Sequence, residues 1–427
     1  MANSKTPDKD GKNKIDEFMS FVIVGHVDHG KSTLIGRLLY DTDSLPTGKI
    51  EEIKKVCEEL GRELEFSYVM DHLEEERQHN ITIDTAQIFF KTKKRRYVII
   101  DAPGHREFLK NMITGASRAE AAVLIIDAKE GVMEQTKRHA YILHLLGVKQ
   151  VIVVINKMDL VGYNQGRFDE ISSNIENFLN LINIIPGCII PISAYYGDNI
   201  TNKSENMGWY NGPTILESLD TFKVSAASLD KPLRYAVQDV YVVNGKRIIA
   251  GRVEAGKIGK YEEIIFMPSK KKAKVASIEV FNEVRTKAGA GMCIGVTIDD
   301  HHFIERGEIA CSTNEKNLKE TGKLKANVFW LGKEPLSLNE RITFKCATKE
   351  SECVIEKIQR KFDSSTLQEI REKQDQIGER EVGELIIRMD NPVFVDNFND
   401  VAELGRFVLE KNNDAIAGGI ILEHNFD

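Results

Sequence analysis

The stretch Gly25-His26-Val27-Asp28-His29-Gly30-Lys31-Ser32 decides how the first half of this chain is expected to fold. It follows the apolar run 21–24 and precedes the helix-forming segment 33–39. A glycine-bounded loop between a strand and a helix, closed by Lys-Ser, is the pattern of a phosphate-binding P-loop. Glycines let backbone N–H groups approach a phosphate, Lys31 neutralises its oxygens, and the Ser32 hydroxyl is suited to Mg²⁺. The sequence therefore predicts a nucleoside triphosphate site at this loop.

Three further polar stretches follow predicted strands at their C-terminal ends. They are Asp101-Ala102-Pro103-Gly104-His105 after 97–100, Asn156-Lys157-Met158-Asp159 after 151–155, and Ser193-Ala194 after 189–192. Open α/β sheets bind their ligands at that edge. A carboxylate at Asp159 can accept the N1–H and N2 amino protons of guanine, a pair of donors that adenine lacks. The four stretches in this order predict a GTP site.

Residues 18–222 resemble the G domain of the translational GTPases related to elongation factors Tu and 1-alpha. The resemblance extends to stretches outside the nucleotide motifs, which are 68–71, 75–77, 81–84, 111–117 and 207–213. It implies that Thr82 reaches Mg²⁺ and the γ-phosphate, and that His105 orients the attacking water. It also implies that Val27 and Ile81 form an apolar gate that restrains His105. Asn80 stands where the family usually has glycine, and asparagine tolerates the left-handed backbone that such a position needs.

These arguments and the resemblance together give the predicted site. Predicted to bind GTP are Gly25, His26, Val27, Asp28, His29, Gly30, Lys31, Ser32, Thr33, Asp101, Gly104, Asn156, Lys157, Asp159, Ser193, Ala194 and Tyr195. Predicted to hold Mg²⁺ are Ser32, Thr82 and, through water, Asp101. Predicted to act in hydrolysis are His105, Lys31 and Thr82.

Alternating strand and helix patterns from 20 to 222 predict a doubly wound, mostly parallel α/β sheet. Within it, 48–62 has the spacing of an amphipathic helix in the first switch. Beyond Pro232, short strands separated by turn residues predict an antiparallel β-barrel, and the strand-rich segment from 323 predicts another. The predicted fold is thus an α/β P-loop GTPase domain followed by two small antiparallel β-barrels. The expected limits are a disordered tail 1–16, the G domain 17–224, and barrels at 231–316 and 320–427.

Composition sets limits on partners and location. The 427 residues carry a net charge of −7, which argues against a broadly basic, nucleic-acid-coating surface. The six cysteines show no Cys-x-x-Cys spacing, which argues against a zinc site and for a reduced compartment. No apolar stretch reaches the length of a membrane span, and residues 1–14 lack the pattern of a signal peptide. These features predict a cytoplasmic protein without a membrane partner.

Several kinds of protein share this G domain, and the region from 323 onward is expected to differ among them. The stretches 324–338, 363–367 and 381–384 resemble the GTPase subunit of heterodimeric ATP sulfurylase, and the His-Thr pair of elongation factors is not found there. This resemblance implies a regulatory sulfate adenylyltransferase subunit. It would couple GTP hydrolysis to adenosine 5′-phosphosulfate formation from ATP and sulfate on a separate, PAPS-reductase-like catalytic partner.

Two alternatives stay open. One is a translation elongation factor that delivers aminoacyl-tRNA to the ribosome, which is the direction indicated by His26 and His29 in the P-loop. The other is a GTPase that serves a different partner. Among these three readings, only the translation factor involves nucleic acid.

Overall fold

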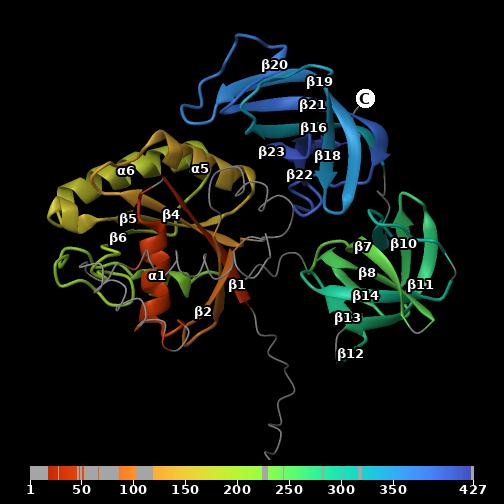
Figure 1. The fold of residues 1–427 in the computed structure, drawn as a ribbon, viewed down its shortest axis with the longest axis horizontal. Coiled ribbons are helices and arrows are strands. Elements are labelled where there is room, and N and C mark those ends of the chain that lie inside the picture. The colour runs from red at the N-terminus through yellow and green to blue at the C-terminus, as the bar shows by residue number, and fades with distance from the viewer. Residues whose placement is uncertain are drawn as a thin grey trace, which may run out of the picture.

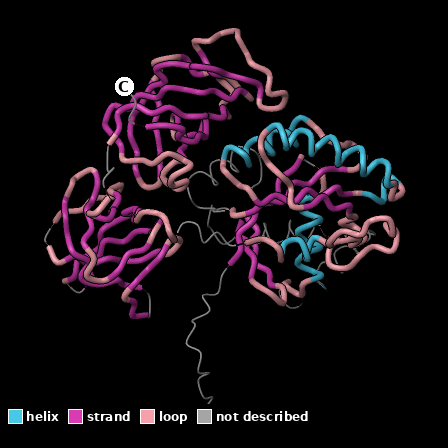
Figure 2. The backbone as a smooth tube through the Cα atoms, turned by 180° about the vertical axis from the view of Figure 1, so that it is seen from behind, coloured by secondary structure: helices cyan, strands magenta, loops and turns pink. Residues whose placement is uncertain are grey.

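The fold is taken from a computed structural model. It describes residues 18–26, 28–45, 48, 51, 66, 86–101, 119–223, 229–243, 245–280, 283–300, 302–315 and 320–424. Three parts follow one another along the chain: an α/β domain and two β-barrels (Figure 1). The described helices all lie in the first part, whereas the other two consist of strands and loops (Figure 2).

The α/β domain is built on a sheet of six strands in the order β2-β3-β1-β4-β5-β6. These are β1 (Phe18–Gly25), β2 (Ala86–Lys91), β3 (Arg96–Asp101), β4 (Ala121–Asp127), β5 (Gln150–Asn156) and β6 (Cys188–Pro191). All neighbours pair in parallel except the edge strand β2, which runs antiparallel to β3. Strand order changes direction at β1, so the loops after β1 and β3 leave the sheet beside a natural ligand crevice.

Helices cover both faces of this sheet. They are α1 (Lys31–Asp41), α5 (Glu134–Leu145), α6 (Gln165–Leu181) and α7 (Ile215–Leu219), with a 3₁₀ helix η1 at Met158–Val161. Alternate residues of the strands face opposite sides: Leu124 packs with α5 and α6, whereas Val123 packs with α1 and α7. Because both faces are covered, β4 is buried along its whole length, as parallel sheets require. The helix predicted at 48–62 lies outside the described residues.

The second part is a small antiparallel barrel. Its strands are β7 (Arg234–Val243), β8 (Lys246–Ala255), β9 (Lys257–Gly259), β10 (Glu263–Met267), β11 (Lys271–Val280), β12 (Glu283–Arg285), β13 (Lys287–Gly289), β14 (Cys293–Ile298) and β15 (Ile309–Ser312). The sheet closes because β10 pairs with β15 on one side and with β11 on the other.

The third part is a closed barrel in the order β16-β21-β19-β18-β22-β23. Its strands are β16 (Thr321–Trp330), β18 (Arg341–Cys346), β19 (Lys349–Asp363), β21 (Glu381–Val393), β22 (Arg406–Lys411) and β23 (Asp414–His424), and β17 (Leu336–Ser337) pairs separately with β20 (Gln376–Ile377). Alternate residues of β16 fill its interior. The predicted fold class, a P-loop α/β domain followed by barrels, is confirmed, whereas the predicted domain limits stay predictions.

The third part packs directly on α5 of the α/β domain. Apolar residues of the barrel share one core with the helix; they are Phe329, Leu331, Val382, Val408 and Ile420. The rings of Tyr141 on α5 and Phe362 on β19 meet edge to face, with centroids 6.0 Å apart. The helix is therefore enclosed between the sheet on one side and the barrel on the other.

A buried arginine joins the two barrels. Arg234, at the start of β7, donates from Nε and Nη2 to both carboxylate oxygens of Asp396 at 2.7 and 2.8 Å. The same guanidinium donates to Glu315 at 2.6 and 2.7 Å, and its side chain is only 4% exposed. The bidentate pair with Asp396 fixes both distance and orientation between the barrels, and the pair with Glu315, which follows β15, holds the guanidinium in place.

Replacing Arg234 tests that junction. We expect Arg234→Ala to lower the free energy of unfolding by about 3–5 kcal/mol, because two carboxylates then stay behind without their cation. Arg341→Ala is the matched control: Arg341 pairs with Asp390 while 71% exposed, and such surface pairs contribute about 0–1 kcal/mol. Urea denaturation of both variants measures the difference, and equal losses would contradict the role assigned to Arg234.

Candidate nucleotide-binding site

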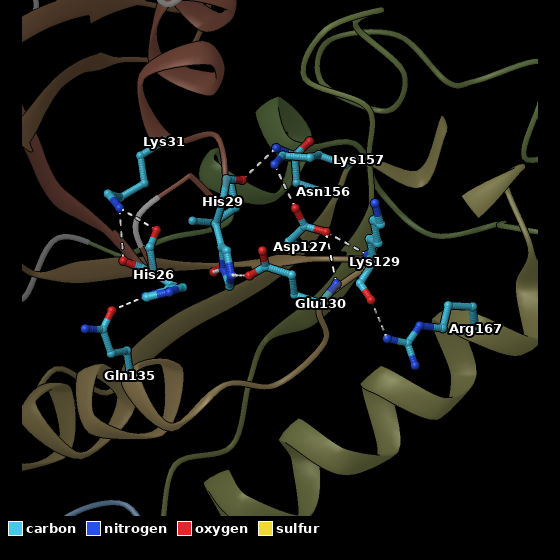
Figure 3. Close-up of polar contacts among 12 residues, drawn as sticks. His26, His29, Lys31, Asp127, Lys129, Glu130, Gln135, Asn156, Lys157 and Arg167 are labelled. Atoms are coloured by element: carbon cyan, nitrogen blue, oxygen red, sulfur yellow. Dashed lines mark hydrogen bonds and ion pairs between the residues drawn. The ribbon is translucent and has the colours of Figure 1, made fainter. Parts of the chain in front are cut away.

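The described residues of the loop between β1 and α1 have the features that a P-loop needs. Lys31 opens α1 and its Nζ donates to the carbonyl oxygens of Gly25 at 3.0 Å and His26 at 2.8 Å (Figure 3). Gly30 has φ of +90° directly before the helix, and a Cβ there would lie 2.4 Å from the side-chain nitrogen of Asn156. Only glycine fits both constraints. The helix N-terminus is thereby presented next to the Lys31 ammonium, an arrangement suited to phosphate oxygens.

Asn156, at the end of β5, links the phosphate loop to the base-side loop. Its side-chain Nδ2 donates to the carbonyl oxygen of His29 at 2.9 Å, and its Oδ1 accepts from the backbone N–H of Ala194 at 2.9 Å. Asn156, Ser193 and Ala194 are all buried. The predicted phosphate and base residues are thus brought together by a single amide.

Asp159 offers an acceptor whose partner is missing from the described residues. It lies in η1 directly beyond β5, and its Oδ1 is buried with no hydrogen-bond partner there. A buried acceptor without a partner costs about 1–3 kcal/mol. A guanine base would supply the N1–H and N2–H donors that satisfy it, so the residues present fit guanine. Tyr195 lies in the loop of Ser193 and Ala194. Its carbonyl oxygen accepts a hydrogen bond from Arg37 on α1 at 3.3 Å.

The predicted magnesium and hydrolysis residues are only partly described. Ser32 is exposed in the first turn of α1, with Thr33 beside it, and Asp101 closes β3, the neighbour of β1. The Ser32 hydroxyl at a helix N-terminus fits an octahedral ion that keeps its waters and phosphate ligands. Val27, Ile81, Thr82, Gly104 and His105 lie outside the described residues. Within those that are described, no three His, Cys, Asp or Glu side chains gather as a metal site.

Two acidic residues at this edge were missed by the sequence reasoning. Asp127 ends β4, and its Oδ2 lies 2.7 Å from the Nζ of Lys157. Glu130 follows in the next loop, with its Oε2 3.1 Å from Nε2 of the buried His29. The signal was available for Asp127, which follows the apolar run 121–126 in the same way that Asp101 follows 97–100. Glu130 carried no such signal, because only the folded loop brings it to His29.

Burial acts on both ionisable groups, with different outcomes. Burial raises the pKa of Asp127, but the ammonium of Lys157 and the N–H groups of Lys129 and Glu130 outweigh it, so the pKa lies below its ordinary value. Burial lowers the pKa of His29, against the opposing effects of the Ile125 carbonyl and Glu130. Asp127 is therefore a buried anion at neutral pH.

This chain matches two known protein families, one at each end. Residues 16–238 match the family described as elongation factor Tu GTP binding domain, and residues 323–422 match the GTP-eEF1A C-terminal domain-like family. This chain belongs to the translational GTPases related to elongation factors Tu and 1-alpha. It is a GTP-binding protein and a GTPase.

Individual relatives span nearly the whole chain. Elongation factor 1-alpha of Pyrococcus furiosus is 39% identical over 416 residues, covering 95% of this chain and 97% of the relative. Elongation factor 1-alpha of Thermoplasma acidophilum is 38% identical over 410 residues, covering 94% and 96%. A solved structure of Sup35 with GDP covers 96% of this chain and 95% of its own, at 23% identity and a TM-score of 0.45.

The predicted identity as an ATP sulfurylase subunit is wrong. The region used to choose it, from 323 onward, is the region that matches the eEF1A C-terminal domain. The stretches in this region help to form the barrel. Leu324, Ala326, Val328 and Trp330 fill its interior. Asp363 accepts hydrogen bonds from two backbone N–H groups in a turn. Any protein with this barrel needs such residues, so they do not distinguish one family from another.

Across the part of the chain that the structure describes, every helix is too short or too polar to pass through a lipid bilayer.

Asp159→Asn tests the guanine assignment. We expect GDP affinity to fall about 10- to 100-fold, because the base loses a charged acceptor and meets an amide donor instead. Xanthosine diphosphate, which presents an oxygen at C2, should bind the variant better than the wild type. Isothermal titration measures both. Asp169→Asn, an exposed carboxylate on α6, is the control and should bind GDP as the wild type does. Unchanged GDP affinity in Asp159→Asn would contradict the assignment.

Proposed function

We propose that this protein is a translation elongation GTPase that binds aminoacyl-tRNA in its GTP state and delivers it to the ribosome in the cytoplasm. The observation that carries the proposal is identity of 36–39% to proteins named elongation factor 1-alpha over nearly the full chain, barrels included. The P-loop with His26 and His29 agrees with it. The geometry of the site adds the orphaned Asp159 acceptor, which suits a guanine nucleotide.

The proposed partners differ from those first predicted. A catalytic sulfurylase subunit as partner is wrong, because the relatives that match both ends of the chain are elongation factors. Nucleic acid was expected as a partner only of a translation factor, and that is now the proposed function. A net charge of −7 still excludes a broadly basic coat. The RNA contact must then be local, with a limited number of phosphates neutralised by lysine and arginine.

The residues of the site divide the work of binding and hydrolysis. Lys31, the backbone N–H groups of the P-loop and Gly104 bind the phosphates, and Asp159 reads the base. Ser32, Thr82 and, through water, Asp101 would hold Mg²⁺, which would neutralise part of the negative charge of the phosphates. His105 orients the attacking water, and Val27 with Ile81 restrains it until the switch is engaged. Such phosphoryl transfer depends on positioning and electrostatic stabilisation.

His105→Ala tests the hydrolysis step. We expect GDP and GTP affinities to stay within about twofold while the hydrolysis rate falls at least about tenfold, because the water loses its orienting group. Single-turnover hydrolysis of bound GTP measures the rate, from a basal value on the order of 10⁻⁴ s⁻¹ without a partner. His302→Ala, in the second part of the chain and outside the site, is the control and should hydrolyse GTP at the wild-type rate. Retained hydrolysis in His105→Ala removes that histidine from the mechanism.

Binding of aminoacyl-tRNA tests the function itself. In the presence of a non-hydrolysable GTP analogue, aminoacyl-tRNA should bind at least about tenfold more tightly than with GDP, a coupling free energy of about 1.4 kcal/mol or more. Fluorescence anisotropy of labelled aminoacyl-tRNA measures this, and deacylated tRNA is the control. Equal affinity in the two nucleotide states, or equal affinity for deacylated tRNA, would overturn the proposal.

A further inference from the structure

We infer that Asp127 and Glu130 are positioning residues that connect the turn of Lys157 and Asp159 to the phosphate loop and thereby set how long a guanine nucleotide stays bound. We call the segment 127–131 the bridging loop. It contains none of the residues predicted to bind nucleotide. The inference rests on the guanine nucleotide site proposed above and concerns residues that act on that site through others.

Asp127 is the last residue of β4, the strand between the one that leads into the phosphate loop and the one that leads into Lys157 and Asp159. β4 lies between β1 and β5 in the sheet, and Asp127 is in register with Asn156. Its Oδ2 lies 2.7 Å from Lys157 Nζ, while its Oδ1 accepts from the N–H groups of Lys129 at 2.7 Å and Glu130 at 3.2 Å. One carboxylate thus holds the Lys157 side chain and shapes the bridging loop at the same time.

Glu130 carries the connection on to the phosphate loop. The loop shaped by Asp127 places the Glu130 carboxylate 3.1 Å from His29 Nε2, and His29 Nδ1 lies 3.2 Å from the carbonyl oxygen of Ile125 (Figure 3). The His29 side chain is fully buried, whereas that of Glu130 is 47% exposed. Glu130 therefore reaches inward from the surface to a ring that is part of the P-loop.

Arg167 of α6 supports the bridging loop from outside. It donates from Nε to the carbonyl oxygen of Ala128 at 2.8 Å and from Nη2 to that of Lys129 at 3.0 Å. The start of α6 is fixed by Asn164, whose side chain accepts from the Arg167 N–H. Arg167 thus holds two backbone carbonyl groups of the bridging loop, and the Asp127 carboxylate holds two of its backbone N–H groups.

The consequence concerns Lys157 and Asp159. Lys157 has a left-handed backbone with φ of +62° and directly precedes the η1 turn that carries Asp159. The Asp127 carboxylate is buried, whereas the Lys157 side chain is 31% exposed, so the ion pair holds Lys157 at the edge of the site. Without the Asp127 charge, the Lys157 side chain and this turn lose their anchor, and the guanine-reading carboxylate loses its fixed position. The Asn156 amide joins the phosphate loop to the loop of Ala194, so the bridging loop is a separate connection, which runs from the phosphate loop to Lys157.

The test is the dissociation of a fluorescent GDP from the full chain, followed by stopped flow. We expect Asp127→Asn to release GDP at least about tenfold faster and Glu130→Gln about threefold faster, while association rates stay within about twofold. In a Lys157→Ala background, Asp127→Asn should raise the dissociation rate by a smaller factor than in the wild type, because one of the two sets of contacts of Asp127, the ion pair, is already gone. Glu134→Gln is the control: its side chain is 70% exposed and pairs with Arg138, and its release of GDP should match the wild type.

The outcomes separate cleanly. Dissociation rates within about twofold of wild type in both Asp127→Asn and Glu130→Gln would overturn the inference, as would full additivity with Lys157→Ala. If Asp127→Asn does not fold, Glu130→Gln decides the question, because its half-exposed side chain can lose its charge without leaving a buried cation. Thermal melting of nucleotide-free Glu130→Gln should match the wild type, and a lowered melting temperature that accounts for the faster release would also overturn the inference. Failure of the wild type itself to bind GDP counts against the proposed function instead.

Discussion

The side-chain amide of Asn156 is the contact on which the geometry of the site depends. It uses its donor on the P-loop carbonyl of His29 and its acceptor on the N–H of Ala194, and it is buried between them. Its position also leaves no room for a side chain at Gly30. The phosphate loop and the loop of Ala194 are more than 150 residues apart in sequence. One side-chain amide holds both of them, with one hydrogen bond to each loop.

That amide can act in this way because the two strands beneath it, β4 and β5, have apolar interiors. β4 and β5 are covered on both faces, so polar side chains find no place along them until the strands end. At those ends Asp127 and Asn156 stand in register, one ionised and one neutral, each with its partners supplied by neighbouring loops. Buried polar groups are costly unless they are satisfied, so each one here restricts the loops around it. The rigidity of the site follows from the hydrophobic core rather than from the nucleotide.

This arrangement explains what the sequence could and could not predict. The motifs at strand ends could be predicted, because an apolar run followed by a polar cluster marks the end of a strand in an α/β sheet. Asp159 could be predicted because a carboxylate matches the donors of guanine. Glu130 was not legible, since its contact to His29 exists only once two loops are placed. The third part of the chain was misread for a different reason. Its stretches looked specific, but residues such as Trp330 and Asp363 serve the interior and turns of the barrel. Burial pattern reports the fold, and the choice between families needs the whole chain.

The position of α5 connects the site to the rest of the molecule. The helix begins three residues beyond the bridging loop, and in its first turn Gln135 hydrogen-bonds to His26 of the P-loop (Figure 3). One and a half turns further on, Tyr141 packs against Phe362 of the third part, inside a core shared by the helix and the barrel. A close-packed interface of this kind does not deform gradually; it is either kept or exchanged for another packing. A helix that contacts the phosphate loop through Gln135 and the barrel through Tyr141 is thus the element through which a change at the nucleotide can alter how the barrels sit. Because Arg234 and Asp396 join the barrels to each other, such a change moves them together.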